Sequence, residues 1–323
     1  MEHREDLPLV KVLATGGTIA NTPSGRLHAG EVADAIPELR KVARLEIEEL
    51  VRVASSAITV ENWLALARRS AEVVEDAGVK GIVVTHGSNA VEETAYFLSL
   101  TVKSDKPVVL TAAQRQFTTL SSDSPRNFLQ AVRVAASEEA RGKGALVVTN
   151  DMIHAARDVS KNISSRVETY SSRDLGALGF VDDDRVTFYR EPVKRHTTAT
   201  PFDARRLQVL PRVDIIHTYA DADGSLIEAA VAHGAAGIVI AGFPTGSGTP
   251  AQEDAVKRVA AKGIPVVMTN RGGMGRVIDK KPKEARPFVF GDNLTPVKAR
   301  VLLMLALTTT RDRAELQRIF ERY

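Results

Sequence analysis

The chain has 323 residues, 44% of them hydrophobic, which is enough to bury a sizeable core in two domains of ordinary size and excludes a disordered protein. Its 43 basic and 40 acidic residues are interspersed and leave a net charge of only +3, so the charge does not indicate a nucleic-acid partner. The sequence contains no cysteine, which excludes disulfides, thiolate nucleophiles and cysteine-bound metal ions.

The N-terminal stretch "MEHREDLPLVKVLATGG" is charged and then runs directly into a strand pattern. It lacks the charged, apolar and small-residue regions of a secretory signal peptide. No apolar run in the chain approaches the ~18 residues that a membrane span needs. We therefore expect a cytoplasmic protein that does not contact a membrane.

Short apolar runs then alternate with helical patterns through the first two thirds of the chain. The runs predict strands at 9–14, 81–84, 107–112 and 145–150, and the patterns predict helices at 59–78 and 124–142. Nearly continuous apolar runs are typical of parallel strands covered on both faces. The second helix is expected to begin with Ser124 as its cap and Pro125 in the first helical position.

A polar, proline-bearing stretch at 191–211 separates this region from a second alternation. Strands are predicted within 212–220, 237–243 and 264–270, and helices after Thr249-Pro250 and Thr295-Pro296. The predicted fold class is α/β with two domains. A larger N-terminal domain (1–190) with a mostly parallel sheet is joined by a linker (191–211) to a smaller C-terminal α/β domain (212–323).

Two polar turns follow predicted strands, "LATGGTIA" at 13–20 and "VTHGSNAVEETAYFL" at 84–98. The carboxyl end of a parallel strand is where an open sheet presents a ligand site. The first turn is too short for a phosphate-binding loop, and its glycine spacing does not fit a dinucleotide fingerprint. In the second turn Asn89 has a structural alternative, as the cap of the following helix with Glu92 completing a capping box.

These two segments, together with "PVVLTAAQR" (107–115), "NDMIHAARDVSKN" (150–162) and the closing "KARVLLMLALTTT" with "LQRIFERY", occur in the order and spacing of the bacterial L-asparaginase family. The chain resembles that family over essentially its whole length. The resemblance implies an amidohydrolase of two α/β domains that attacks a side-chain amide through a threonine. It also implies a homotetramer built from close dimers and a small-molecule amide as the partner, and no cofactor or metal is expected.

Carried over by position, the resemblance implies that the nucleophile is Thr18, the second threonine of "TGGTIA". Ser88 replaces the second threonine of the family's "THGTD", and Lys161 in "DVSKN" matches the family's lysine. Ser56 in "ASSA" matches the serine that holds the substrate's α-carboxylate. These residue types suit acyl transfer, because a hydroxyl needs a nearby base and the oxyanion needs aimed donors. Each also has a structural alternative: Thr18 as a helix cap, Ser88 as a turn residue and Lys161 as a surface lysine.

The sequence departs from the family where the family binds the substrate's α-ammonium. Asn89 stands in place of an aspartate, Ala57 in place of a glutamine, and Leu27 is the nearest match to the tyrosine of a mobile lid. The family's acidic residue from the neighbouring subunit has no clear counterpart in the basic, glycine-rich stretch at 270–288. A neutral Asn89 removes a charged hydrogen bond to an ammonium and favours the neutral form of Lys161.

The sequence thus keeps the residues that acyl transfer needs, whereas all the residues that contact the substrate's α-ammonium in the family are replaced. We infer an amidase whose substrate has no α-amino group, or carries it blocked, in a less polar pocket lined by Leu27, Ala57 and Asn89. Two alternatives stay open: a catalytically weak homologue that binds a small amide, and an L-asparaginase that carries an inactivating Asn89 substitution. The sequence does not identify the acyl group or its stereochemistry, nor whether ammonia or a larger amine leaves.

Overall fold

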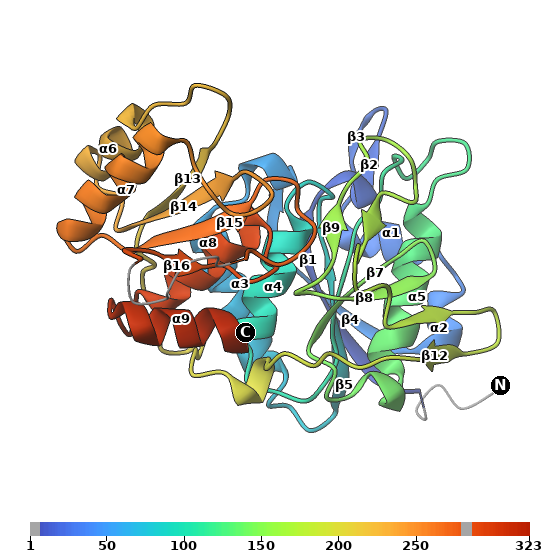
Figure 1. The fold of residues 1–323 in the computed structure, drawn as a ribbon. Helices are drawn as coiled ribbons and strands as arrows, with labels where there is room; N and C mark the ends of the chain where they lie inside the picture. Colours follow the sequence, from blue (N-terminus) through green and yellow to red (C-terminus); the bar gives the residue numbers. More distant parts are fainter. Residues whose placement is uncertain (1–6, 279–285) are drawn as a thin grey trace. The chain divides into compact units, whose positions relative to one another are not determined.

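The computed structural model of the chain describes residues 7–278 and 286–323, and the chain divides into two compact units, Met1–Leu207 and Gln208–Tyr323. Each unit is built around one large sheet with helices on both faces (Figure 1). The predicted fold class is therefore confirmed, with a larger N-terminal sheet unit and a smaller C-terminal α/β unit.

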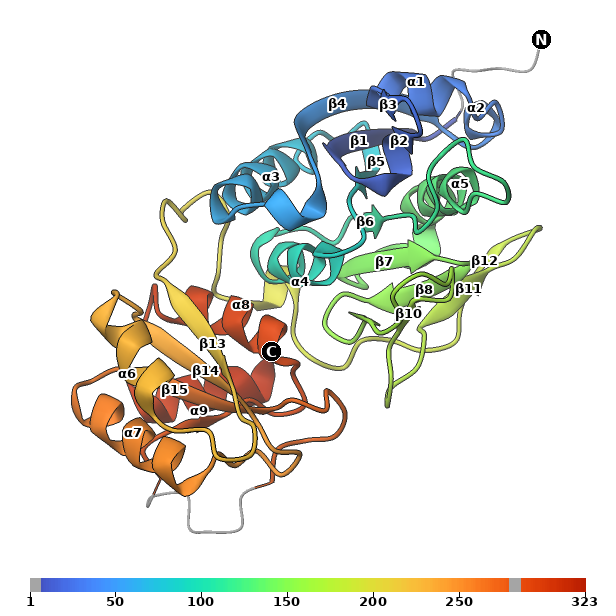
Figure 2. The same cartoon turned by 90° about the horizontal axis from the view of Figure 1, so that it is seen from above.

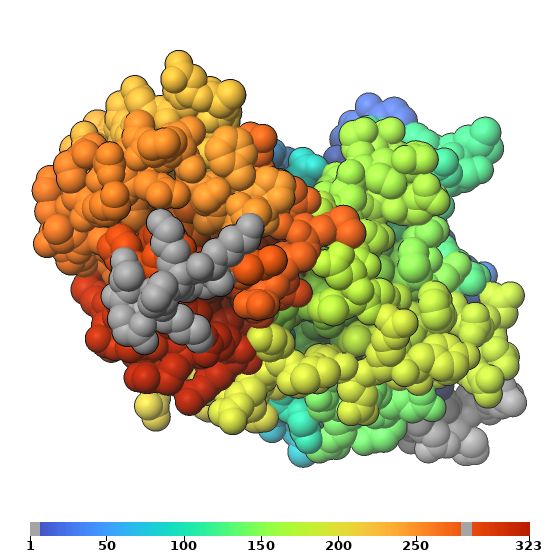
Figure 3. All heavy atoms as spheres, viewed as in Figure 1, coloured from blue at the N-terminus to red at the C-terminus, as the bar shows by residue number. Residues whose placement is uncertain are grey.

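The sheet of the first unit has the strand order β12-β11-β8-β7-β6-β5-β1-β4. Its β4, β1, β5, β6 and β7 are parallel, whereas β8, β11 and β12 continue it as antiparallel strands. The edge formed by β11 and β12 lies at the molecular surface (Figure 3). The strands are β1 (Leu9–Gly16), β4 (Arg44–Val53), β5 (Val79–Thr85), β6 (Val108–Thr111), β7 (Ala145–Thr149), β8 (Met152–Ala155), β11 (Gly179–Val181) and β12 (Val186–Phe188).

Helices cover both faces of this sheet: α3 and α4 lie on one face, and α1, α2 and α5 on the other (Figure 2). Their bounds are α1 (Ala29–Asp34), α2 (Leu39–Val42), α3 (Val60–Val73), α4 (Val91–Thr101) and α5 (Ser124–Ala136). Two small hairpins complete the unit, β2 (Asn21–Thr22) with β3 (Gly25–Arg26), and β9 (Ser160–Lys161) with β10 (Tyr170–Ser171). Short 3-10 turns are η1 (Thr18–Ala20), η2 (Ser55–Ala57), η3 (Glu138–Ala140) and η4 (Thr197–Ala199).

Local sequence explains most of these elements. The predicted strands are found with buried side chains along most of their length, as expected for strands covered on both faces. Helix α3 begins with a capping box in which Thr59 and Asn62 satisfy each other's backbone amides, and it ends at Val73 rather than at Gly78. The predicted cap of α5 was wrong, because the cap position is Asp123 and the Ser124 hydroxyl instead donates to the Ile19 carbonyl at 2.6 Å.

The stretch at 191–211, which the sequence predicts to be a linker, packs partly against the first unit. Phe202 is buried, and the Lys103 ammonium donates to the Thr197 carbonyl at 2.9 Å and to the Thr200 hydroxyl at 2.6 Å. These bonds hold the backbone around η4 in place.

The second unit has a parallel sheet in the order β13-β14-β15-β16, with α6 and α7 on one face and α8 and α9 on the other (Figure 1). Helix α7 begins after Thr249, as predicted, with a capping box of Thr249 and Gln252 and with Pro250 in its first turn. No helix in the described part of the chain is long and apolar enough to cross a membrane. The elements are β13 (Val213–His217), α6 (Ser225–Ala232), β14 (Gly237–Gly242), α7 (Pro250–Ala261), β15 (Val266–Asn270), β16 (Val289–Phe290), α8 (Pro296–Ala306) and α9 (Arg313–Arg322).

Candidate active site

Thr18 stands in a tight turn at the carboxyl end of β1. Gly16 and Gly17 both have φ of 91°, a left-handed conformation that side chains other than glycine rarely adopt. Thr18 is half-buried and begins η1, whose cap position is Gly17, so its hydroxyl does not cap that turn. Among residues 7–278 and 286–323, no hydrogen-bond partner holds the Thr18 hydroxyl. The hydroxyl is therefore free to react.

The second polar turn follows β5 and lies directly against the first. Sheet register places Ala14 beside Thr85, and the Thr15 hydroxyl donates to the Thr85 carbonyl at 3.0 Å. A Cβ added at Gly17 would lie only 2.3 Å from the Gly87 Cα, so the two turns touch through glycine backbone. This contact fixes the position of Thr18 relative to the turn that carries Ser88.

Ser88 is buried, and both its side-chain hydroxyl and its backbone carbonyl accept hydrogen bonds. Its hydroxyl accepts a hydrogen bond from the Lys161 ammonium at 2.9 Å, and its carbonyl accepts one from the Tyr170 hydroxyl at 2.6 Å. Lys161 and Tyr170 are paired across the β9–β10 hairpin, so one small element supplies both donors. The structure thus brings together two residues that the sequence predicts to act together.

Asn89 does not cap helix α4, contrary to the structural alternative drawn from the sequence. The cap position is Ala90 and no side chain caps the helix, while Glu92 accepts from the Lys161 backbone N–H at 3.1 Å instead of closing a capping box. The Asn89 side chain is exposed, and its Oδ1 accepts from the Lys161 ammonium at 3.0 Å. The hydrogen bond from Lys161, and not a cap on the first amides of α4, determines where the Asn89 carboxamide lies.

Lys161 is in a partly buried environment that lowers the pKa of its ammonium, because burial disfavours the charged form, while the Glu92 carboxylate opposes that shift. The sequence also predicts a lowered pKa for Lys161, but from the neutral Asn89, whereas burial of the ammonium is the main cause. Burial also raises the pKa of the Tyr170 hydroxyl, with a smaller contribution from Glu92. Tyr170 therefore stays neutral and acts as a hydrogen-bond donor.

The His86 side chain makes hydrogen bonds that hold the turn after β5. It is fully buried, and burial lowers the pKa of its imidazole to about 4. Its Nδ1 lies 2.8 Å from the Gly87 carbonyl, which can only accept, so Nδ1 carries the proton and Nε2 accepts from the Thr94 hydroxyl at 3.0 Å. Thr94 in turn accepts from the Trp63 indole at 2.8 Å. His86 is thus a satisfied structural histidine. His154 is also buried, and its Nδ1 lies 2.9 Å from the Ser172 hydroxyl.

The serine that contacts this turn is Ser55, the neighbour of the predicted substrate-binding Ser56. Ser55 is buried, and its hydroxyl accepts from the Asn89 backbone N–H at 3.0 Å. Ser56 and Ala57 follow it in η2 and are exposed. Two adjacent serines at the end of a strand have no distinguishing periodicity, so the sequence offers no signal that would separate them.

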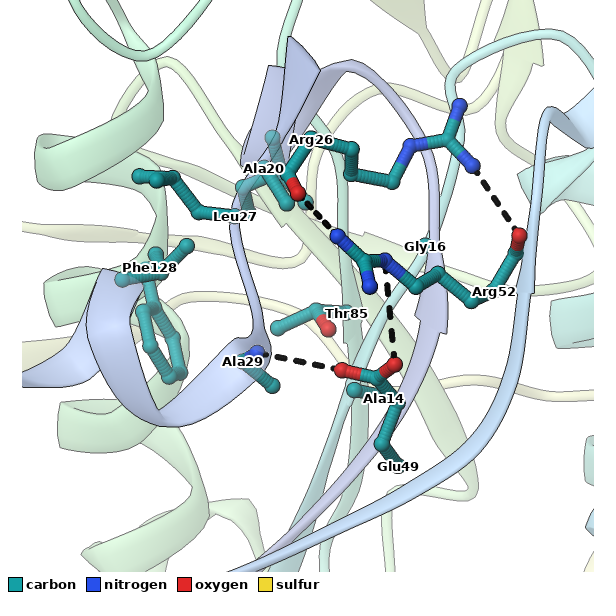
Figure 4. A pocket seen from close by; sticks show the side chains of 12 residues that line it. Ala14, Gly16, Ala20, Arg26, Leu27, Ala29, Glu49, Arg52, Thr85 and Phe128 are labelled. Carbon is teal, nitrogen blue, oxygen red and sulfur yellow. Dashed lines mark hydrogen bonds and ion pairs between the residues drawn. The ribbon is translucent and has the colours of Figure 1, made fainter. Parts of the chain in front are cut away.

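Leu27 directly follows the β2–β3 hairpin. It is half-buried, packs against the core of the first unit, and its N–H donates to the Ala20 carbonyl at 2.9 Å. Figure 4 shows the narrow pocket there, where Arg26 donates to the Arg52 carbonyl at 3.2 Å and Arg52 donates back to the Arg26 carbonyl. This reciprocal pair fastens the hairpin to β4.

The stretch at 270–288 falls partly outside the described residues, since 279–285 are not described. The remainder contains a turn in which the Asn270 Oδ1 accepts from the N–H groups of Gly272 at 2.6 Å and Gly273 at 3.1 Å. Among residues 7–278 and 286–323, no group of three or more His, Asp or Glu side chains is arranged to hold a metal ion.

Comparison with known proteins places this geometry in context. The family described as "Asparaginase, N-terminal" matches residues 9–194, and "Glutaminase/Asparaginase C-terminal domain" matches residues 212–320. The chain is 42% identical to L-asparaginase 2 of Bacillus subtilis over 99% of this chain and 88% of that protein. It is 38% identical to a probable periplasmic L-asparaginase of Haemophilus influenzae over 98% of this chain and 93% of that protein.

A solved structure gives the same result. The probable cytoplasmic L-asparaginase from Campylobacter jejuni superposes with a TM-score of 0.94 at 41% identity, covering 98% of this chain and all of that one. The protein is therefore a hydrolase of the class that acts on C–N amide bonds. The chain belongs to the bacterial L-asparaginase and glutaminase-asparaginase family.

Proposed function

We propose that the chain hydrolyses the carboxamide of a small molecule through an acyl-enzyme formed on Thr18. The Thr18 oxygen attacks the amide carbon, its proton passes to the Ser88–Lys161 pair, and the C–N bond breaks as the nitrogen is protonated and leaves as ammonia. Backbone N–H groups of the two turns are the donors available to the oxyanion. Water then attacks the ester, which releases the carboxylic acid and restores the threonine hydroxyl.

The free hydroxyl of Thr18 and the hydrogen bond between Ser88 and Lys161 support this assignment. A lysine whose pKa is lowered by burial is neutral more often at a given pH and is therefore more often able to accept a proton. The contact between Gly17 and Gly87 holds the nucleophile's turn against the turn that carries Ser88.

We further propose that the substrate has no free α-amino group. The observation that carries this proposal is the 3.0 Å hydrogen bond from the Lys161 ammonium to the Asn89 carboxamide oxygen. A neutral carboxamide provides no negative charge for a substrate ammonium. Ala57 and Leu27, at the positions that the sequence matches to the family's other ammonium contacts, carry no polar side-chain group.

The second candidate substrate is L-asparagine itself, because the relatives are named L-asparaginases. Assays of ammonia release separate the two candidates. L-Asparagine and L-glutamine carry the ammonium, succinamate and glutaramate lack it, and N-acetyl-L-asparagine carries it blocked. We expect faster hydrolysis of the compounds without the charge. Preference for L-asparagine over succinamate would exclude the proposed substrate class while leaving the amidase assignment intact.

The role of Thr18 has its own test. Thr18→Ala should lower kcat by roughly 10³-fold or more, since no other hydroxyl replaces the nucleophile. The thermal unfolding temperature should change little, because a half-buried polar turn residue contributes little to the core. Thr18→Ser retains a hydroxyl and is the matched control, with part of the activity preserved. Unchanged turnover in Thr18→Ala would remove Thr18 from the mechanism.

We also propose that the active form is a homotetramer, or at least a dimer, in the cytoplasm. The family membership supports the assembly, and the description of the Campylobacter relative as a probable cytoplasmic protein supports the compartment. The Haemophilus relative is named as periplasmic, so the compartment stays a prediction.

A further inference from the structure

The peptide bond between Ser88 and Asn89 is held at both ends by side-chain hydroxyls. Its carbonyl accepts from the Tyr170 hydroxyl at 2.6 Å, and its N–H donates to the Ser55 hydroxyl at 3.0 Å. Tyr170 and Ser55 are only 3% and 8% exposed, so both hydroxyls are held inside the protein. The peptide therefore has one defined orientation, although it lies in a turn.

The orientation of this peptide affects the contacts of Lys161. The common turn types differ mainly in how their central peptide is turned, so a peptide inside a turn can flip unless partners hold it. A flip here would change ψ of Ser88 and φ of Asn89, and these backbone angles determine which side-chain rotamers are allowed. The side chains on either side of the peptide both accept from the Lys161 ammonium, the Ser88 hydroxyl at 2.9 Å and the Asn89 Oδ1 at 3.0 Å. Both contacts therefore depend on the partners that hold the peptide.

Tyr170 connects the same peptide to the element that carries Lys161. The two residues are paired directly across the β9–β10 hairpin, whose strands are two residues long each. A hairpin this short has little stability of its own and depends on tertiary contacts. The Tyr170 hydroxyl provides one such contact at the Ser88 carbonyl, and the Lys161 backbone N–H provides another at the Glu92 carboxylate, at 3.1 Å. Both strands of the hairpin are thus fastened to the segment that follows β5.

We propose that Tyr170 is a positioning residue for the reaction, because its hydroxyl holds the Ser88–Asn89 peptide and thereby keeps the Ser88 hydroxyl against the Lys161 ammonium. This inference rests on the proposed amidase function, in which a proton passes to the Ser88–Lys161 pair, and it adds a residue to that function. Tyr170 transfers no proton itself and acts through Ser88. A serine depends on such support more than the family's threonine at this position would, because a branched side chain is stiffer at χ1.

The test is Tyr170→Phe in the full-length protein, which removes the hydroxyl and keeps the buried ring. The measurements are kcat and KM for ammonia release from succinamate and from L-asparagine, well below the unfolding temperature of each variant. We expect kcat to fall roughly tenfold, the order of effect that one hydrogen bond supports, and KM to stay within about twofold, because the bond aligns the proton transfer and not the substrate. Tyr189→Phe, at a tyrosine that is 69% exposed, is the matched control and should leave both constants unchanged.

A second measurement separates positioning of Ser88 from a general loss of structure. Tyr170→Phe is also made in the Ser88→Ala variant, which keeps the peptide but has no hydroxyl to position. In that background Tyr170→Phe should change kcat by less than about twofold. A tenfold loss in both backgrounds, or an unchanged kcat in Tyr170→Phe alone, overturns the inference and leaves the amidase assignment in place. If Ser88→Ala itself leaves kcat unchanged, the proton transfer of the proposed function is refuted, and this inference with it.

Discussion

At the scale of single residues, Lys161 is subject to two opposing influences. Burial of its ammonium lowers the pKa, and the Glu92 carboxylate raises it. Glu92 also accepts from the Lys161 backbone N–H at 3.1 Å, so one side chain both places the lysine and adjusts its charge. With a neutral Asn89, Glu92 is the carboxylate that acts on this lysine in the described part of the chain.

The pH dependence of turnover follows from these charges. A base must be neutral to accept a proton, so activity should be lost as the pH falls through the lowered pKa of Lys161. Glu92→Gln keeps an acceptor for the backbone N–H but removes the charge, and it should shift the acid limb of the kcat profile to lower pH. Asn89→Asp adds a charge and should shift that limb to higher pH. Coincident profiles for wild type and both variants would show that Lys161 does not titrate in the reaction.

At the scale of elements, the two polar turns depend on close backbone contact. A Cβ at Gly87 would lie 2.6 Å from the Ser55 Cβ and 2.7 Å from the Ser55 hydroxyl. Gly17 lies against Gly87 on the other turn. Gly87→Ala should therefore displace the turn and lower both activity and stability, the latter by about 1–3 kcal/mol.

Gly30→Ala is the matched control for that substitution. Gly30 lies in helix α1 with nothing within 4 Å of an added Cβ, so this change should be neutral or stabilising by up to about 1 kcal/mol. The measurements are urea unfolding and kcat for both variants. Equal effects of the two substitutions would show that the contact between the turns is not tight.

The strands and several helix starts were predictable from the sequence because their signals are local. The apolar runs of β1, β5 and β7, and the Thr249 cap of α7, need no distant partner to be recognised. The predicted Ser124 cap was wrong because its hydroxyl donates to the distant Ile19 carbonyl. The structural alternative for Asn89, a cap of α4, is not found either, because its carboxamide oxygen accepts from the Lys161 ammonium. The sequence alone does not indicate which of Ser55 and Ser56 contacts Asn89, since the fold brings the Ser55 hydroxyl to the Asn89 backbone N–H.

At the scale of the whole molecule, the family membership was recognisable because its motifs span the chain from "TGGTIA" to the closing helices. The site was partly predictable: the pairing of Ser88 with Lys161 follows from the motifs, and the structure gives its distance of 2.9 Å. The direction in which Asn89 presents its carboxamide could not be predicted, because it depends on the hairpin that carries Lys161.

Assembly is the prediction at this scale. We expect a homotetramer or dimer, with the loop at 242–249 near the pocket of a partner subunit. Within its own unit this loop is closed by a hydrogen bond from the Phe243 N–H to the Ser247 carbonyl at 2.8 Å. Light scattering at the concentration of the assay should give a mass of two or four chains. A fully active monomer would contradict the proposed assembly.

The central claim is that the neutral Asn89 belongs to a pocket built for a substrate without an ammonium. The most direct test is kcat/KM of wild type and Asn89→Asp on L-asparagine and on succinamate. The new carboxylate could supply one charged hydrogen bond, worth roughly 1.5–3 kcal/mol. We predict that wild type prefers succinamate and that Asn89→Asp loses activity on it without becoming an efficient L-asparaginase. If Asn89→Asp instead hydrolyses L-asparagine faster than wild type hydrolyses succinamate, the protein is an L-asparaginase with one inactivating substitution, and the neutral pocket is refuted.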